Sequence, residues 1–405
     1  MNACNRVVVT GLGVISAIGT GRKKFWEAAL SGASGINEVS SFDTSSFKCH
    51  RAGEVKNFNP EEFIPKRKVK FLGRSSQLAI AAASLAIQDA GFELKTLPKN
   101  KLGVLIGTTM GEKPIEELAQ IWAKGGLKDI DRRRILQSSA NNISANVAMY
   151  AKARGQNYLF PTACAAGNYA IGYGFDLIRS RDIDYALAGG AEAFSYTAFV
   201  GFQRLYAMAT DKCQPFDKNR KGMMLGEGSA MLLLERLDLA LERKREIYAE
   251  IIGYGLSCDA HHATAPEVRG VSQVMEKALK ECSISYKDVD YICAHGTGTP
   301  MNDRIEAQAI KNVFKERAKE IPVNALKSML GHSMGAASAI EAVSCCLSAK
   351  FDTIPPTINY ETPDPQCDID CVPNTKREKI INIAMNNAFA FGGNNSSLVI
   401  KKFIK

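Results

Sequence analysis

Short apolar runs alternate along the chain with stretches in which apolar residues recur every three or four positions. Residues 7–10, 103–107 and 185–188 have the first pattern and are predicted to be buried strands. Residues 76–90 place Leu78, Ala82, Leu85 and Ala86 at helical spacing, and Gly91 follows as a predicted C-terminal cap. Strands and helices that alternate in this way predict a layered α/β fold.

The second half of the chain continues the pattern. We expect amphipathic helices over residues 271–280 and 305–315, and a buried helix of small residues over 336–350. The halves resemble each other weakly, because Ala188-Gly189-Gly190 closes a predicted strand and Ala390-Phe391-Gly392-Gly393 precedes another, at 397–400. We therefore predict two related halves, residues 1–248 and 249–405, the first with a nucleophile candidate and the second with the histidines.

Composition and cysteine usage narrow the class of protein. The 405 residues are 46% hydrophobic and 23% charged, which is typical of a globular protein with a substantial core. The chain shows no secretory signal, and no apolar run reaches the roughly 18 residues of a membrane span. Its 11 cysteines have no regular spacing, which argues against a disulfide framework or a zinc site and predicts a cytoplasmic location.

Basic residues are in excess, with a formal net charge of +9. Two dense basic runs contribute, Lys66-Arg67-Lys68 and Arg132-Arg133-Arg134. Each run could be an ordinary solvated face or a docking patch for an acidic partner. Nucleic acid is a weaker third choice, because aromatic residues are not interleaved with the basic ones.

Cys164 is the strongest nucleophile candidate. The apolar stretch 158–160 leads into Pro161-Thr162-Ala163-Cys164-Ala165-Ala166-Gly167, and a helical pattern continues to Arg179. This arrangement places the thiol at a helix start, where the helix dipole lowers a cysteine pKa and backbone N–H groups can bind an oxyanion. The alternative, a buried structural cysteine, fits this strand–turn–helix context less well.

Two of the five histidines lie in glycine-rich turns. His295 belongs to Ala294-His295-Gly296-Thr297-Gly298-Thr299-Pro300, and His332 to Lys327-Ser328-Met329-Leu330-Gly331-His332. Such turns let a backbone approach a ligand closely. A cysteine protease needs one histidine and an orienting Asn or Asp, so a second histidine donor suits carbanion chemistry better.

Four motifs taken together resemble the elongating β-ketoacyl-acyl-carrier-protein synthases of the thiolase-like superfamily. They are Thr-Ala-Cys, His-Gly-Thr-x-Thr-Pro, Lys-Ser-x-x-Gly-His and a late Phe-Gly-Gly, and they occur in the family's order over essentially the whole chain. The resemblance implies a thiolase-like fold, that is, a duplicated, layered αβαβα architecture with two mixed sheets. Gly11-Leu12-Gly13 alone is a poor dinucleotide motif, because the third glycine is missing.

The resemblance also implies roles for individual residues. Cys164 would accept the acyl chain, and His295 and His332 would stabilise the enolate formed when malonyl-carrier-protein loses CO2. Lys327 and Glu341 would support the histidines, with Asp303 in a further supporting position. The N–H groups of Cys164 and of the gate residue Phe391 would form an oxyanion hole. The remaining matches are substrate-binding positions (Thr297, Thr299, Thr264, His262, Met110 and Met223) and carrier-docking positions (Lys66, Arg67, Lys68 and Arg204).

The chain departs from the family pattern at two of these places. Arg220-Lys221-Gly222-Met223-Met224 stands where the family often has Arg-Asp-Gly-Phe, and Ala390 replaces the first glycine of the Gly-Phe-Gly-Gly gate. Met110 matches a pocket position that faces the dimer partner and limits acyl length. These changes leave the cysteine and histidines intact and favour a specialised acyl or polyketide chain as substrate.

The leading interpretation is a condensing enzyme of dissociated fatty-acid synthesis that acts as a homodimer with acyl carrier protein. The alternative is the ketosynthase subunit of a dissociated polyketide or polyene synthase, paired with a chain-length-factor subunit. A silent scaffold subunit is disfavoured because Cys164, His295 and His332 are all present, and a degradative thiolase because no late cysteine follows Cys371. We expect no metal or other cofactor, no nucleic acid and no membrane partner, since the substrates travel on phosphopantetheine.

Overall fold

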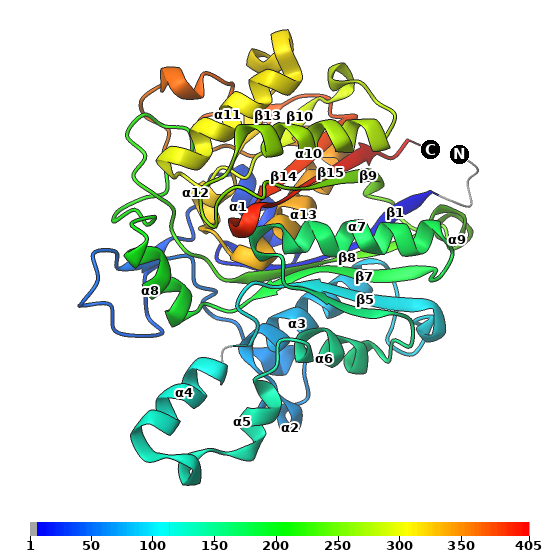
Figure 1. Cartoon of the computed structure of the whole chain (residues 1–405). Coiled ribbons are helices and arrows are strands. Elements are labelled where there is room, and N and C mark those ends of the chain that lie inside the picture. The colour runs from blue at the N-terminus through cyan, green and yellow to red at the C-terminus, as the bar shows by residue number, and fades with distance from the viewer. Residues whose placement is uncertain (1–5, 113, 405) are drawn as a thin grey trace.

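The computed structural model describes residues 6–112 and 114–404, which form a layered α/β protein around one long mixed sheet (Figure 1). Within these residues the main sheet has eleven strands, in the order β11-β10-β14-β15-β9-β1-β8-β7-β5-β6, with β2 paired to β1. The strands of the first half are β1 (Val7–Ser16), β2 (Gly19–Thr20), β5 (Leu102–Gly107), β6 (Asn157–Phe160), β7 (Tyr185–Glu192) and β8 (Gly228–Arg236). Those of the second half are β9 (Ala249–Cys258), β10 (Tyr291–Cys293), β11 (Val323–Asn324), β14 (Ile383–Phe389) and β15 (Asn394–Lys402).

The two halves repeat one strand order. Numbered within its own half, each five-stranded series runs third, second, fourth, fifth, first, as β6-β5-β7-β8-β1 and as β11-β10-β14-β15-β9. The first three strands of each series are parallel, and the last two join antiparallel. The two half-sheets meet where Val7–Val9 of β1 pairs antiparallel with Ala249–Ile251 of β9. The predicted duplicated thiolase-like fold is confirmed, except that the two expected mixed sheets are joined through β1 and β9 into one. The exact division between residues 248 and 249 stays a prediction.

The resemblance proposed between the glycine-rich segments 188–190 and 390–393 was wrong in its details. Gly189 and Gly190 do not close a strand, because β7 continues to Glu192. A Cβ at Gly189 would lie 1.9 Å from the carbonyl oxygen of Ala230 on the neighbouring β8. These glycines are therefore required by close packing inside the sheet, whereas Phe391–Gly393 lies in the turn between β14 and β15.

Helices complete five layers. Helices α3 (Arg74–Asp89) and α6 (Asn142–Ala151) cover the outer face of the first half-sheet, and α10 (Val268–Glu281) and α11 (Pro300–Phe314) cover that of the second. Between the half-sheets lie α7 (Ala166–Arg179) and α13 (Ala337–Phe351), which contact each other and strands of both halves (Figure 1). The αβαβα order predicted from the sequence is thus the order observed.

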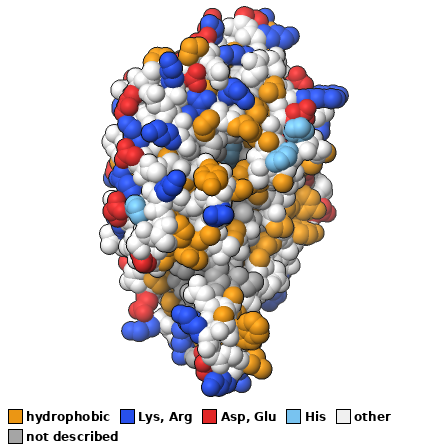
Figure 2. All heavy atoms as spheres, turned by 60° about the vertical axis from the view of Figure 1, so that its left-hand side comes forward, with side chains coloured by type: hydrophobic (Ala, Val, Ile, Leu, Met, Phe, Trp, Pro, Cys, Tyr) orange, Lys and Arg blue, Asp and Glu red, His pale blue; other side chains and the backbone are white. Residues whose placement is uncertain are grey.

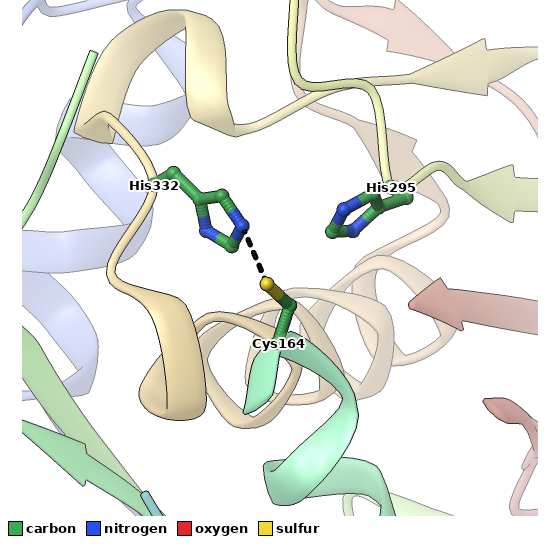
Figure 3. Close-up of side chains that lie close together, drawn as sticks. All are labelled: Cys164, His295 and His332. Carbon is green, nitrogen blue, oxygen red and sulfur yellow. Dashed lines mark hydrogen bonds between the residues drawn. The ribbon is translucent and has the colours of Figure 1, made fainter. Parts of the chain in front are cut away.

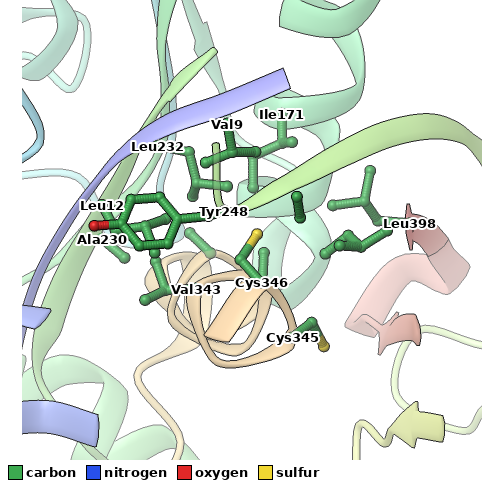
Figure 4. Packing of buried hydrophobic residues seen from close by; sticks show 14 of the residues in the cluster. Val9, Leu12, Ile171, Ala230, Leu232, Tyr248, Val343, Cys345, Cys346 and Leu398 are labelled. Carbon is green, nitrogen blue, oxygen red and sulfur yellow. The ribbon is translucent and has the colours of Figure 1, made fainter. Parts of the chain in front are cut away.

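Helix α13 is buried because its sequence is made of small and apolar residues. Figure 4 shows Val343 and Cys346 of α13 against Ala230 and Leu232 of β8, with Leu398 of β15 nearby. Residues from both half-sheets therefore share one core cluster with this helix. Close packing on both faces fixes the start of α13, which carries the turn that contains His332.

The predicted helices are found, each with bounds that differ by a few residues. The helix predicted over 76–90 is α3. Gly91 follows its last turn with φ +73°, the left-handed conformation that is common just after the C-terminus of a helix. The other helices are α1 (Arg22–Leu30), α2 (Lys66–Val69), α4 (Pro114–Gly125), α5 (Arg132–Gln137), α8 (Tyr196–Arg204), α9 (Leu237–Glu242) and α12 (Lys327–Leu330). Two-residue strands pair as β3 (Asn37–Glu38) with β4 (Arg51–Ala52) and β12 (Thr353–Ile354) with β13 (Arg377–Glu378). None of the described helices is both long and apolar enough to cross a bilayer.

Candidate active site

Cys164 lies in the tight turn between β6 and α7. Ala163, just before it, has φ +47°, and the short 3-10 turn Ala163–Ala165 runs directly into the first residue of α7. A positive φ at a residue with a Cβ is uncommon and marks a turn that the surrounding packing enforces. The thiol is only 7% exposed and points toward the second half of the molecule (Figure 3).

His332 faces this thiol from the other half. It follows Gly331, where φ is +71° and a Cβ would lie 2.5 Å from the carbonyl oxygen of Leu225. Nε2 of His332 lies 3.0 Å from Sγ of Cys164 (Figure 3). On the opposite side of the ring, Nδ1 accepts the N–H of Met334 at 3.2 Å. Because Nδ1 is an acceptor, the proton of the neutral ring must sit on Nε2, which then donates to the sulfur.

His295 completes the group from the loop after β10. Its ring stands edge-on to that of His332, with centroids 5.3 Å apart, and also contacts Phe389 at 5.8 Å. Glu306 of α11 accepts the backbone N–H groups of His295 and Gly296, each at 2.8 Å. These two bonds fix the loop that carries His295. Its buried Nδ1 has no hydrogen-bond partner among the described residues.

Burial dominates the electrostatics of all three groups. Burial raises the pKa of Cys164 to about 12, against the opposing effect of the Lys327 charge. The sequence predicted a lowered thiol pKa at the helix start, and that expectation is wrong, because the cost of burying a thiolate exceeds the stabilisation around it. Burial and the Lys327 charge also hold the pKa of His295 and of His332 well below the usual value, so both rings are neutral.

Lys327 and Glu341 form a buried ion pair beside these groups. Nζ of Lys327 lies 2.5 Å from Oε1 of Glu341, and each side chain is 2% exposed. Burial raises the pKa of Glu341 to about 7, and the lysine charge acts in the opposite direction. Asp303 is also buried and accepts the N–H groups of Phe216 at 2.8 Å and Gly298 at 3.2 Å. It therefore supports the loop after His295 without reaching the thiol.

Among the described residues, one group of His, Cys and acidic side chains has donor atoms close enough to share a metal ion. It consists of Cys164, His295 and His332, whose atoms lie within 4.8 Å of one another. A histidine that binds a metal normally donates its other ring N–H to an acceptor. His332 instead receives an N–H at Nδ1 from Met334, which keeps the proton on the nitrogen that faces the site. The group therefore fits a hydrogen-bond donor site and does not fit a metal site.

A cavity of about 80 Å³ adjoins Cys164. Ten residues singled out from the sequence line it: Cys164, His295, His332, Thr297, Thr299, Thr264, His262, Met223, Ala390 and Phe391. The hydroxyls of Thr297 and Thr299 lie 2.9 Å apart, and Nδ1 of His262 accepts the N–H groups of Thr264 and Ala265, each at 3.1 Å. Met110 does not line this cavity; it packs in a neighbouring hydrophobic cluster that includes Met223.

Phe391 forms part of the cavity wall and is 38% exposed. Its ring lies against that of Phe202 on α8, with centroids 5.5 Å apart. Ala390, in the place of the family's glycine, has the extended conformation φ −114°, ψ 153°. Alanine adopts this conformation without strain, so the observed conformation of the loop does not need a glycine at position 390.

The predicted docking residues do not form one patch. Lys66, Arg67 and Lys68 are exposed on the short helix α2, beside α5, whereas Arg204 is exposed at the end of α8 (Figure 1). The side chain of Arg133 lies outside the described residues. Figure 2 looks onto the side of the molecule that carries α8 and shows hydrophobic side chains in the middle of this face with basic ones around them. Arg204 is thus the docking candidate nearest to the cavity, because Phe202 of the same helix lines it.

The sequence pattern did not reveal several residues that touch the site or its loops, among them Glu306, Phe202 and Phe389. Glu306 could have been found, because Asp303 and Glu306 are one helical turn apart just after the His295 loop and so face back toward it. Phe202 and Phe389 had no comparable pattern. Each is an aromatic residue among other apolar ones, and only the packing of α8 and β14 brings both to the cavity.

The chain was compared with known protein families and curated proteins. Residues 4–240 match the model described as "Beta-ketoacyl synthase, N-terminal domain", and residues 248–361 match "Beta-ketoacyl synthase, C-terminal domain". The chain is 40% identical to 3-oxoacyl-[acyl-carrier-protein] synthase 2 of Staphylococcus aureus strain COL, over all of both chains. It is also 40% identical to the protein of the same name from Synechocystis sp., over 98% of each chain.

Solved structures show the same relationship in three dimensions. The ishigamide ketosynthase/chain length factor matches with a TM-score of 0.96 and 41% identity, over 99% of this chain and 100% of that one. A β-ketoacyl synthase from Burkholderia phymatum matches with a TM-score of 0.92 and 32% identity, over 99% and 100% of the two chains. The ketosynthase in a type II polyketide complex with its acyl-carrier protein matches with a TM-score of 0.91 and 33% identity, again over 99% and 100%.

Proposed function

The chain belongs to the β-ketoacyl synthase family, and we propose that it joins an acyl group held on Cys164 to malonyl-acyl-carrier-protein by decarboxylative condensation. One observation carries this proposal: a thiol from one half of the chain faces two neutral histidines from the other, with Nε2 of His332 3.0 Å from Sγ. One sulfur nucleophile and two ring nitrogens are the groups that a two-step acyl transfer and condensation requires.

In the first half-reaction Cys164 takes the acyl group. The sulfur attacks the thioester carbon of acyl-carrier-protein, the bond to the pantetheine sulfur breaks, and that sulfur leaves with the thiol proton. The Nε2–H of His332 favours the attacking thiolate, because a hydrogen bond to the charged form stabilises it. The N–H groups of Cys164 and Phe391 are the proposed donors to the oxyanion that forms on the acyl carbonyl.

In the second half-reaction the malonyl group loses CO2. The bond between its carboxylate and the α-carbon breaks, and the electron pair moves into an enolate whose oxygen carries negative charge. N–H donors from His332 and His295 can bind this oxygen in a site without bulk water, where such bonds are strong. The α-carbon then attacks the acyl carbon on Cys164, and the collapse of the tetrahedral intermediate breaks the bond to the cysteine sulfur and releases the β-ketoacyl product. The Cys164 thiolate that leaves takes up one proton from solvent, which restores the thiol.

The Lys327 charge helps to keep both histidines neutral during this chemistry. A histidinium would bind the enolate more tightly but would also be expected to form an ion pair with the malonyl carboxylate and hold it in place. Lys327 and burial keep both imidazoles neutral, so they act as donors without carrying a charge of their own. Thr297 and Thr299 line the cavity and can hold the amides of the pantetheine arm, with Thr264 and His262 at its mouth. No cofactor is required by these steps, which stays a prediction.

The test is intact-mass analysis of the full chain after incubation with acyl-carrier-protein thioesters. Wild-type protein should gain one acyl mass, and Cys164→Ala should gain none, because the thioester has no other attachment point. Cys213→Ala is a matched control, since Cys213 is also buried and its thiol lies near Thr297 without lining the cavity. Acylation of the Cys164→Ala protein at the wild-type rate would refute the assignment.

A ketosynthase subunit of a dissociated polyketide synthase is a second candidate function. The observation that favours it is the match to the ishigamide ketosynthase/chain length factor, whose TM-score of 0.96 exceeds the 0.92 of the β-ketoacyl synthase from Burkholderia phymatum. The replacements at residues 221–224 and 390 point the same way. A condensation assay on this chain, expressed without any partner subunit, distinguishes the two functions. A fatty-acid enzyme should condense acyl and malonyl groups without a second subunit.

The proposed subunit partner would bind along β6. This strand ends the main sheet, and its outer edge has no partner strand among the described residues. Tyr158 of β6 and Tyr173 of α7 are 40% and 36% exposed, with rings 5.2 Å apart, and Met149 of α6 is 68% exposed. An edge strand bordered by exposed apolar side chains is a typical site for strand pairing between subunits. Light scattering after gel filtration should show a dimer, and Tyr158→Pro should weaken it; a wild-type monomer would refute the proposal.

A further inference from the structure

Glu192 is a buried carboxylate for which the proposed chemistry has no use. It is the last residue of β7, it is 0% exposed, and it does not line the cavity beside Cys164. Burial of a carboxylate is expensive unless its oxygens are fully hydrogen-bonded. Its partners therefore indicate why it is tolerated at this place.

Glu192 joins the loop after β5 to the turn after His332. Oε1 accepts the N–H of Met110 at 2.9 Å and the hydroxyl of Thr108 at 3.2 Å. Oε2 accepts the N–H of Thr109 at 2.6 Å and that of Gly335 at 3.0 Å. Three of these donors belong to the loop after β5 in the first half, and the fourth belongs to the turn after His332 in the second.

The two loops touch around this carboxylate. A Cβ at Gly335 would lie 2.4 Å from Cα of Thr108, so only glycine allows the observed approach. Two backbones this close leave no room for water between them. The carboxylate of Glu192 thus supplies the acceptors that the N–H groups of both loops require.

The turn held by Glu192 also determines which ring nitrogen of His332 carries the proton. Gly335 follows Met334, whose N–H donates to Nδ1 of His332. We propose that Glu192 is a positioning residue: by holding the Gly335 N–H it keeps the Met334 N–H on Nδ1, and so keeps the ring proton of His332 on Nε2, against Cys164. This inference rests on the donor role proposed for His332, but its first consequence, the tautomer, can be measured without any substrate.

A glutamine cannot replace this carboxylate without loss. Four donors converge on two oxygens, and the NH2 group of a glutamine would face two of them. The turn after His332 or the loop after β5 must then move away. If the Met334 N–H leaves Nδ1, the ring can carry its proton on either nitrogen, and Nε2 ceases to be a permanent donor.

Glu112 provides a matched control. It is also buried, at 2% exposure, and burial raises the pKa of Glu112 and that of Glu192 to about 7 each, so both are charged at pH 8. Glu112 accepts from the backbone and hydroxyl of Ser76 and makes no hydrogen bond to the turn after His332. Glu112→Gln therefore reproduces the general cost of altering a buried carboxylate in this region.

The experiment uses the full chain labelled with ¹⁵N at the histidine rings. With five histidines the spectrum is simple, and His332→Ala assigns the signals of His332. At pH 8, wild type and Glu112→Gln should show one tautomer, protonated at Nε2. Glu192→Gln should show both tautomers, and its rate of malonyl decarboxylation should fall roughly 10–100-fold, by analogy with the loss of a partner that orients a metal-binding histidine.

Thr108→Val is a milder second variant in case Glu192→Gln does not fold. It removes one of the four donors to Glu192 and should give a smaller shift toward the second tautomer. The inference is overturned if His332 keeps the Nε2 proton in Glu192→Gln, or if Glu112→Gln changes the tautomer equally. A protein that shows the expected tautomers but no condensation in wild type would instead refute the proposed function.

Discussion

Replacement of Lys327 by methionine tests the electrostatics of the site through stability. Lys327 and Glu341 are 2.5 Å apart and both buried. Removal of one member of such a pair costs roughly 3–5 kcal/mol when the other stays charged. Glu341 can avoid part of this cost by taking up a proton, because burial already raises its pKa to about 7. Loss of Lys327 removes the charge that opposes this rise, so the pKa must increase further.

The sign of the pH dependence follows from this shift. A carboxyl whose pKa is higher in the folded than in the unfolded state loses about 1.4 kcal/mol of stability per pH unit between the two values. In the wild type this loss ends near pH 7, where Glu341 ionises; in Lys327→Met it continues at higher pH. The free energy of unfolding of Lys327→Met should therefore be lower than that of the wild type by up to about 1.4 kcal/mol for each pH unit above 7. The difference should stop growing at roughly 5 kcal/mol, the cost of a fully charged, unpaired Glu341.

Urea unfolding at pH 6.5, 7.5 and 8.5 measures this difference. Lys350→Met is the matched control. Lys350 lies at the exposed end of α13, the helix that carries Glu341, and pairs with Glu246 at 3.1 Å. This substitution should cost at most about 1 kcal/mol of stability at every pH. Lys327→Met with Glu341→Leu should recover most of the stability but not the activity, since the pKa of both histidines would rise. A cost for Lys327→Met that is small and independent of pH would refute the reasoning.

Three further predictions concern the reaction. His295→Ala and His332→Ala should each slow malonyl decarboxylation roughly 10²–10³-fold while retaining some acylation of Cys164, as measured by CO2 release and intact mass; near-normal CO2 release in both would contradict the donor role. Charge reversal at Arg204 should raise KM for carrier-bound substrate more than for a small pantetheine thioester, as should reversal of residues 66–68, and equal effects on both substrates would identify a solvated face. Ala390→Gly should speed acylation by long or bulky primers, because glycine gives the loop access to positive φ; identical acylation time courses at every primer length would show that residue 390 does not control the gate.

The fold and the reacting groups could be predicted from the sequence for physical reasons. Strands and helices were visible because buried positions repeat at two different periods, and Cys164, His295 and His332 because each lies in a turn of unusual composition. Bounds were less accurate, as for α11, which begins at Pro300 although only residues 305–315 show a clear apolar face. The ends of helices depend on capping, which the hydrophobic pattern does not report.

What could not be predicted depends on distances between parts of the chain far apart in sequence. The lowered thiol pKa was inferred from a local feature, the helix start, whereas the observed shift comes from burial by both halves. The Met334 N–H at Nδ1 of His332, which decides between a donor and a metal ligand, depends on the backbone geometry of the turn, which the sequence pattern does not report. The separation of Lys66, Arg67 and Lys68 from Arg204 required the packing of α2 and α8 on different parts of the body.

The repeated strand order means that the chain resembles a dimer whose two subunits have been fused. In a true dimer of identical halves, whatever one half placed near the shared axis the other would have to place there too. A thiol of one half could then face the imidazoles of the other only in two equivalent copies, and each half would have to carry both groups. Fusion releases each half from the sequence of its twin, so that one can specialise as nucleophile and the other as donor. The single pairing of Cys164 with His295 and His332 is thus the result of two halves that share a fold and differ in sequence.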